Sequence, residues 1–194
     1  MNDAAGGAVT RVLERVSRVA VWIAGGMMLG TVGLVSAEVV LRKLLNMSFG
    51  GADELSGYAY AIASSWAFAF ALLSRDHIRI DVVYVVFPAR VRAALDMIAL
   101  ASLGAFAVML AIYAGQALSF SLEMGATANT PLATPLWIPQ ALWLLGFILF
   151  LAVLAVQFIR SASALARGDL ETLHSIAGTK TVRDEVREEL DRQA

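Results

Sequence analysis

Residues Val19–Ala37 read VAVWIAGGMMLGTVGLVSA, a stretch of 19 positions without a charged side chain. An α-helix rises about 1.5 Å per residue, so about 20 apolar residues cover the hydrocarbon core of a bilayer, which is about 30 Å thick. This stretch is therefore long enough to cross a membrane as one helix. It is too long for the apolar core of a signal peptide and lacks a convincing cleavage-site pattern, so we expect it to remain as the first span.

Three further uncharged stretches follow, at residues 55–74, 97–122 and 124–159. The last is too long for one straight span, but three prolines crowd its first part, and proline disfavours helix both at its own position and in the residue before it. We therefore predict an exposed or re-entrant connection over residues 125–134. The expected fold is an all-α, multi-pass integral membrane protein with four transmembrane helices, whose spans lie at about 19–37, 55–74, 97–122 and 136–159.

The composition agrees with this class of protein. Of the 194 residues, 59% are apolar and 16% are charged, and the mean hydropathy is +0.70. A soluble domain is nearer half apolar and one quarter charged. The net charge of -1 and the lack of a basic block with interleaved aromatic side chains argue against nucleic acid as a partner. The chain has no cysteine, which excludes disulfides, thiolate metal sites and a cysteine nucleophile.

Lys and Arg are distributed unevenly between the two ends of the predicted spans. The N-terminal segment, the second connection and the C-terminal tail together carry 13 of them, whereas the first connection carries only Arg42 and Lys43. Cytoplasmic segments are enriched in these residues. Both termini are therefore predicted to be cytoplasmic, with a lead-in over residues 1–18, a four-helix membrane domain over 19–159 and a charged tail over 160–194.

The lead-in is compatible with two interpretations. Its apolar residues recur at helical spacing, opposite three arginines, namely Arg11, Arg15 and Arg18. This pattern suits an amphipathic helix that lies on anionic membrane lipid. A solvated helical extension would show the same pattern.

Small residues at four-residue spacing mark three of the spans. They are Gly26 and Gly30 in the first, Ala59, Ala63, Ala67 and Ala71 in the second, and Ala107, Ala111 and Gly115 in the third. Helices in lipid associate through close packing at small residues, because the hydrophobic effect does not drive them together. We expect a compact bundle, and the sequence leaves open whether these ridges meet each other or a partner subunit.

Charged residues gather at the first connection. Glu38 and Arg42 are four positions apart on one helical face, and a charge at this depth is costly unless it is paired, so we predict an ion pair. Asp53 and Glu54 come just before the second span, where acidic groups suit a helix N-terminus, and Asp53 is a candidate cap for a helix that starts at Glu54. These four residues either anchor and cap the helices or contact another membrane subunit.

Residues that carry chemistry are otherwise sparse. The segment Arg75–Asp81 interleaves charged residues and His77 with isoleucines, which suits a segment at the membrane interface. No metal-ligand spacing, nucleotide loop or Ser/His/Asp set occurs, so we expect no catalytic residue, cofactor or metal. The spans contain only glutamines as long polar side chains and show no internal repeat, which is unlike a secondary carrier. These glutamines are Gln116, Gln140 and Gln157.

Four short stretches stand in a characteristic order. They are VLRKLLN at 40–46, ADEL at 52–55, DHIRID at 76–81 and TPLATPL at 130–136. Their order and spacing resemble the small membrane subunit of tripartite ATP-independent periplasmic (TRAP) transporters, the DctQ-type family. The resemblance covers roughly residues 35–158. The chain departs from the family at Gly51, where an aromatic residue, often Trp, is usual.

The resemblance implies a role rather than a reaction. In the family, a large DctM-type permease carries the substrate and the coupling sodium, and a DctP-type periplasmic binding protein delivers the solute, usually an organic acid. The small subunit packs against the permease as a scaffold in the bacterial inner (cytoplasmic) membrane, helps to dock the binding protein, and so serves sodium-coupled symport. The positions carried over, with structural or subunit-interface roles, are Glu38, Arg42, Asp53, Glu54, His77, Arg79 and Asp81.

Two other classes of function remain as alternatives. A small integral membrane enzyme acting on lipid would need acids, histidines or a nucleophile gathered at one interface, and only Arg75–Asp81 offers such a group. A free-standing small exporter would need a carboxylate embedded in the membrane, for which Glu38 is the nearest fit.

Overall fold

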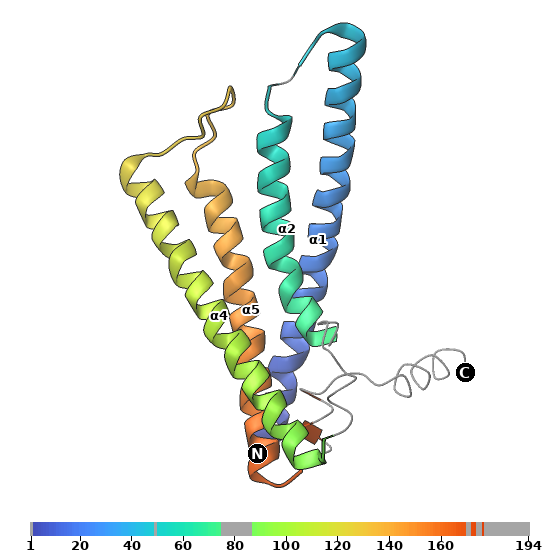
Figure 1. Cartoon of the computed structure of the whole chain (residues 1–194), viewed down its shortest axis with the longest axis vertical. Helices are drawn as coiled ribbons and strands as arrows, with labels where there is room; N and C mark the ends of the chain where they lie inside the picture. Colours follow the sequence, from blue (N-terminus) through green and yellow to red (C-terminus); the bar gives the residue numbers. More distant parts are fainter. Residues whose placement is uncertain (1, 49, 75–86, 170–171, 174–175, 177–194) are drawn as a thin grey trace, which may run out of the picture. The chain divides into compact units, whose positions relative to one another are not determined.

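The computed structural model describes residues 2–48, 50–74, 87–169, 172–173 and 176, with side chains from residue 8 onward. This part of the chain contains four long helices, labelled in Figure 1: α1 (Asn2–Leu45), α2 (Ala52–Ser74), α4 (Ala89–Met124) and α5 (Trp137–Ala166). All four are long and apolar enough to cross a membrane. The described residues form no strand beyond a single β-bridge. The prediction of an all-α fold with four helices of membrane-spanning length is confirmed.

The helices extend beyond the predicted spans. α1 has 44 residues, which correspond to about 66 Å at about 1.5 Å per residue, more than twice the thickness of a hydrocarbon core of about 30 Å. It passes Arg18 and Glu38 without a break. The described part of the lead-in is therefore the first part of α1 rather than a separate helix. Where α1 enters and leaves the membrane remains a prediction.

A glycine ends α4. Gly125 has a φ of +58°, in the left-handed region where a side chain would be strained. The N–H of Ala126 donates to the C=O of Ser121 at 3.0 Å, and the N–H of Gly125 donates to the C=O of Leu122 at 3.4 Å. These two bonds form a Schellman cap, which satisfies carbonyls that the helix itself leaves without partners. The chain leaves the helix here, where the sequence predicts the start of the connection.

The chain divides into two compact units, residues 1–70 with 106–153, and residues 71–105 with 154–194. In the first unit α2 and α5 approach closely at Gly146. A Cβ added to Gly146 would lie 2.3 Å from Oγ of Ser65 and 2.7 Å from Cδ1 of Trp66. The indole N–H of Trp66 also donates to the C=O of Leu142 at 2.9 Å. A side chain at position 146 would therefore force these two helices apart.

Aromatic rings extend this contact along the first unit. The ring of Phe68 on α2 lies 6.4 Å from that of Phe147 and 5.6 Å from that of Phe150, between centroids. Trp143 meets Phe147 edge to face at 5.1 Å. These are the spacings at which aromatic pairs attract beyond simple burial. Ring contacts thus add to the close approach of α2 and α5 at Gly146.

The predicted ridges of small residues differ in how far they are buried. Ala63 and Ala107 are buried within the chain. Gly26 and Gly30 are exposed, and among the described residues no atom outside α1's own local backbone lies within 4 Å of a Cβ built on either. The GxxxG motif of α1 therefore does not pack against another described helix of this chain.

The second unit has a small core of its own. Ala93, Ala164 and Leu173 are buried there, with Met97 packed against them. The side-chain amide of Gln157 donates to the C=O of Leu72 at 3.4 Å, and so joins α5 to the end of α2. One of the three glutamines singled out in the sequence therefore serves as a contact between helices.

Candidate functional site

The candidate site begins at the turn between α1 and α2. Asn46 follows α1 with a φ of +50°, a left-handed conformation that asparagine adopts more readily than most residues. Gly50 also has a left-handed φ, of +66°. The N–H of Leu55 then donates to the C=O of Gly51 at 3.0 Å, the first hydrogen bond of α2. Two left-handed residues thus reverse the chain within a few positions.

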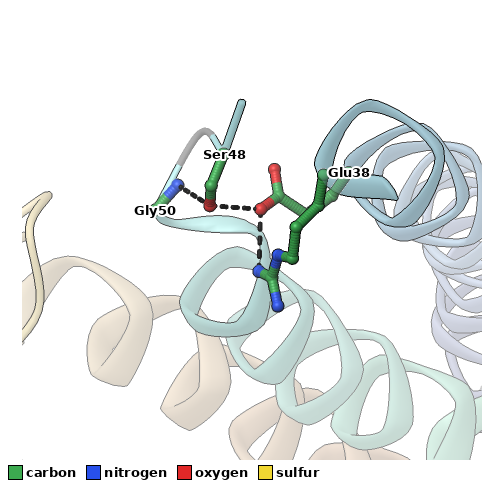
Figure 2. Close-up of polar contacts among 4 residues, drawn as sticks. Glu38, Ser48 and Gly50 are labelled. Atoms are coloured by element: carbon green, nitrogen blue, oxygen red, sulfur yellow. Dashed lines mark hydrogen bonds and ion pairs between the residues drawn. The ribbon is translucent and has the colours of Figure 1, made fainter. Parts of the chain in front are cut away.

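Glu38 is the buried centre of this turn. Glu38 is only 3% exposed, although α1 continues for seven residues beyond it. The guanidinium of Arg42 donates to Oε1 of Glu38 at 2.8 Å, which is the predicted ion pair. The hydroxyl of Ser48 donates to the same oxygen at 2.5 Å, and the N–H of Gly50 donates to the Ser48 hydroxyl at 3.1 Å. Figure 2 shows the chain of contacts from Gly50 through Ser48 to Glu38.

This arrangement explains how a carboxylate is kept at this position. A buried charge is costly unless it is paired and hydrogen-bonded. Arg42, 61% exposed in its side chain, supplies the opposite charge from the surface, and Ser48 supplies a second donor from the turn. The sequence predicted Arg42 through its four-residue spacing. It gave no signal for Ser48, because only the reversal of the chain at the turn brings that hydroxyl back to α1.

The predicted capping role of Asp53 is wrong. α2 begins at Ala52, so Asp53 is its second residue and its side chain is exposed. The residue at the cap position is Gly51, whose C=O accepts the first helical hydrogen bond. Asp53 and Glu54 still lie in the first turn, where an acidic group is favourable to the helix dipole.

Glu54 joins α2 to the connection between α4 and α5. The hydroxyl of Thr130 donates to Oε2 of Glu54, and the hydroxyl of Tyr58 donates to its Oε1 at 3.0 Å. Glu54 and Thr130 are 76 residues apart in the sequence. Glu54 therefore joins the second turn to the first. The sequence did not predict this contact, although Glu54 and Thr130 each belong to one of its motifs.

The connection between α4 and α5 is itself held by backbone bonds. The N–H of Ala128 donates to the C=O of Thr134 at 2.9 Å, and the N–H of Leu136 donates to the C=O of Ala126 at 3.0 Å. Thr127 and Pro135 form an antiparallel bridge between them. The predicted non-helical connection is thus a short hairpin, and its tip carries Thr130.

Leu132 at that tip accounts for the glycine at position 51. A Cβ added to Gly51 would lie 2.2 Å from Cδ1 of Leu132, and one added to Gly50 would lie 3.3 Å from Cγ of Pro131. Leu132 therefore occupies the space that a side chain at position 51 would need. The departure from the family pattern at Gly51 has a structural reason in this chain.

Not all of the predicted positions are placed. His77, Arg79 and Asp81 lie outside the described residues. Glu38, Arg42 and Glu54 belong to contacts at the two turns, whereas the Asp53 side chain is exposed. The remaining predictions for these positions, that they serve a subunit interface, stay predictions.

A buried carboxylate in the second unit was also missed. Asp96 is 1% exposed although it lies within α4, where the sequence suggested only the boundary of a span. It has a polar or ionic interaction, as does Arg92 one turn before it. In the described part of the chain, no group of three or more His, Asp or Glu side chains is arranged to hold a metal ion.

Comparison with protein families gives a match over most of the chain. The family model for "Tripartite ATP-independent periplasmic transporters, DctQ component" matches residues 31–164, more than half of the 194-residue chain. The matched range includes both turns of the site, and the resemblance seen in the sequence is confirmed. Comparisons with curated proteins and with solved structures found no significant match. The chain therefore belongs to the DctQ family, the small membrane subunits of TRAP transporters, which are transporter components.

Proposed function

We propose that this chain braces a large DctM-type permease in the inner membrane of a bacterium and thereby supports sodium-coupled uptake of an organic acid or related solute. Both termini face the cytoplasm in this proposal. The observation that carries it is that the polar residues of the candidate site bind each other. Glu38 is engaged by Arg42 and Ser48, and Glu54 by Thr130 and Tyr58. A site so occupied suits a rigid support better than a binding site for a solute.

The buried acids point the same way. Among the described residues, only Glu38 and Asp96 are buried carboxylates, and each has polar interactions within the chain. A carrier would need ionisable groups near mid-membrane that exchange partners during transport. This distribution supports a scaffold role rather than a free-standing exporter.

The apolar surface supports a partner in the membrane. Trp22 and Leu29 on α1 are 77% and 76% exposed, and large apolar residues on α4 such as Tyr113 and Phe120 are also exposed. These faces are available to lipid and to a second membrane subunit alike. The family assignment makes a large permease the partner that we propose.

The two turns of the site lie, in this proposal, on the periplasmic side. The first and third connections carry few Lys and Arg, as periplasmic segments do. Because the contacts of Glu54 and Leu132 hold the two turns together, they form a defined surface. We propose that this surface helps to dock a DctP-type binding protein.

Co-purification and reconstitution test the proposal. The tagged chain, expressed from its native operon, should purify with a large membrane protein, and the same chain alone in liposomes should move no solute. Uptake by the isolated chain would contradict the scaffold role. Failure to retain any large membrane protein in mild detergent and after cross-linking in native membranes would contradict the proposed partner.

A further inference from the structure

A cavity of about 440 Å³ lies in the first unit, between α1, α2 and α5. Its wall on α1 includes Arg15, Val19 and Ile23, and its opposite wall includes Trp66, Gly146 and Leu149. The volume falls within the range of about 300–1,000 Å³ that is typical of ligand sites. The apolar lining of this cavity has a single charged member, Arg15.

The cavity lies beside the contact between α2 and α5. Gly146 contributes no side chain to fill it, and the α2–α5 contact at Gly146 leaves no room for one. The Trp66 indole is held in place by its hydrogen bond to the C=O of Leu142, so it forms a fixed wall. This space therefore adjoins the α2–α5 contact at Gly146 and Trp66.

The arrangement of charge along the cavity specifies an amphiphile. Arg15 and Ile23 are eight residues apart on α1, which corresponds to about 12 Å along the helix axis. Arg15 lies one turn before Val19, the predicted first residue of the span, and so at the expected depth of lipid headgroups. A ligand that fits has an apolar chain along Val19 and Ile23 and an anionic group at Arg15.

We propose that this cavity holds one acyl chain of an anionic phospholipid from the bilayer, with the headgroup phosphate against Arg15. The guanidinium of arginine matches phosphate with two parallel hydrogen bonds and is only weakly hydrated, so it suits this contact. The acyl chain covers the apolar side chains of Val19 and Ile23, which are exposed along this open space. The lipid then acts as a filler between α1 and the α2–α5 pair.

Lipid retention by the full chain tests the headgroup contact. The chain, purified in mild detergent, is mixed with phosphatidylglycerol or phosphatidylcholine, and bound lipid is counted by native mass spectrometry. We expect one saturable phosphatidylglycerol site, and Arg15→Gln should weaken it about fivefold, the effect of losing one cation beside an anionic lipid. Arg18→Gln is the matched control, because Arg18 is also exposed on α1 but is not among the residues that line the cavity. Equal binding by the two variants would overturn the proposal, as would displacement of the lipid by inorganic phosphate.

Photo-cross-linking tests the acyl chain in native membranes. A photoreactive amino acid at Val19, which lines the cavity, should cross-link to phospholipid in the full chain co-expressed with its permease. The same residue at Val32, which is exposed on α1 outside the cavity, reports general lipid contact. We expect Arg15→Gln to reduce the lipid adduct at position 19 and to leave that at position 32 unchanged. A protein adduct in place of the lipid adduct at position 19 would show that a partner helix fills the cavity and would overturn the proposal.

Discussion

The hydroxyl of Thr130 donates a hydrogen bond to the carboxylate of Glu54, across 76 positions of sequence. This contact fastens the hairpin between α4 and α5 to the first turn of α2. Leu132 packs beside it against Gly51, at the start of the same helix. A polar contact and an apolar contact therefore join the two turns, and each can be tested separately.

The polar contact predicts a coupled loss of stability. Thr130→Val and Glu54→Gln should each lower the melting temperature of the purified chain in detergent, because each weakens the same hydrogen bond. The double variant should lose little more than the worse single variant, since residues in one contact are not additive. Asp53→Asn is the control, because its side chain is exposed in the same helical turn. Additive losses for Thr130 and Glu54 would mean that they act independently.

The apolar contact predicts a rescue. Gly51→Trp introduces the aromatic residue usual in the family, but its side chain would collide with the end of the Leu132 side chain. Because Leu132 is 46% exposed and can move aside, we expect a cost of about 1 kcal/mol, at the lower end of the range for overpacking. Leu132→Ala should recover most of that loss when combined with Gly51→Trp. Thermal unfolding of the two single variants and the double variant measures this.

The control for the rescue is Gly57→Trp on α2. Apart from its chain neighbours and the nearby backbone of α2, no described atom lies within 4 Å of a Cβ built on Gly57, so Leu132→Ala should have no effect on the stability of that variant. If Leu132→Ala improved both tryptophan variants equally, the rescue would not reflect contact with position 51.

Replacing Gly146 by alanine should change the stability of the chain in the direction opposite to that expected from helix propensity. Replacing glycine by alanine inside a helix usually stabilises it by about 0.5–1 kcal/mol. Gly146→Ala should instead destabilise the chain by about 1–3 kcal/mol, because its Cβ meets Ser65 and Trp66. Gly115→Ala should show the usual small gain, because no described atom beyond its chain neighbours and the nearby backbone of α4 lies within 4 Å of a Cβ built there. Chemical denaturation in mixed micelles compares the free energies of unfolding of the two variants. An equal change in both would exclude a close approach of α2 and α5 at Gly146.

The fold could be predicted because it depends on length and composition. Uncharged stretches of about 20 residues have few alternatives to a membrane-spanning helix. The residues from Gly125 to Pro135 correctly indicated the interruption within the uncharged stretch 124–159. The Glu38–Arg42 pair was equally accessible, since a four-residue spacing places two side chains on one helical face.

The rest of the site depends on how turns meet, which spacing does not encode. Ser48 reaches Glu38 only because Asn46 and Gly50 turn the chain back, and Thr130 reaches Glu54 only after two helices have packed. The capping prediction for Asp53 failed for a related reason. The sequence favoured the acidic residue Asp53 as the cap, whereas the C=O of Gly51 accepts the first hydrogen bond of the helix.

The Glu38 contacts predict a link between the turn and assembly. Arg42→Ala leaves the buried Glu38 without its cationic partner, so the α1–α2 turn should loosen. We expect less co-purification of the large permease and less solute uptake from both Arg42→Ala and Glu38→Ala. Lys43→Ala is the matched control, because it removes a neighbouring exposed cation and keeps the Arg42 contact. Full assembly and uptake by both site variants would show that this pair is dispensable.

The absence of cysteine makes the predicted topology directly measurable. Single cysteines at Met47 and Asn129, which are exposed in the first turn and the hairpin, should react with a membrane-impermeant maleimide in cells whose outer membrane alone is opened. A cysteine at Val12, exposed near the start of α1, should react only after the inner membrane is also broken. This pattern follows from the 13 Lys and Arg on the side of the termini, because the membrane potential and the insertion machinery retain such segments in the cytoplasm. Labelling of Val12→Cys in cells with an intact inner membrane would show that the chain has the opposite orientation. The surface formed by Glu54 and Leu132 would then face the cytoplasm, away from any periplasmic binding protein.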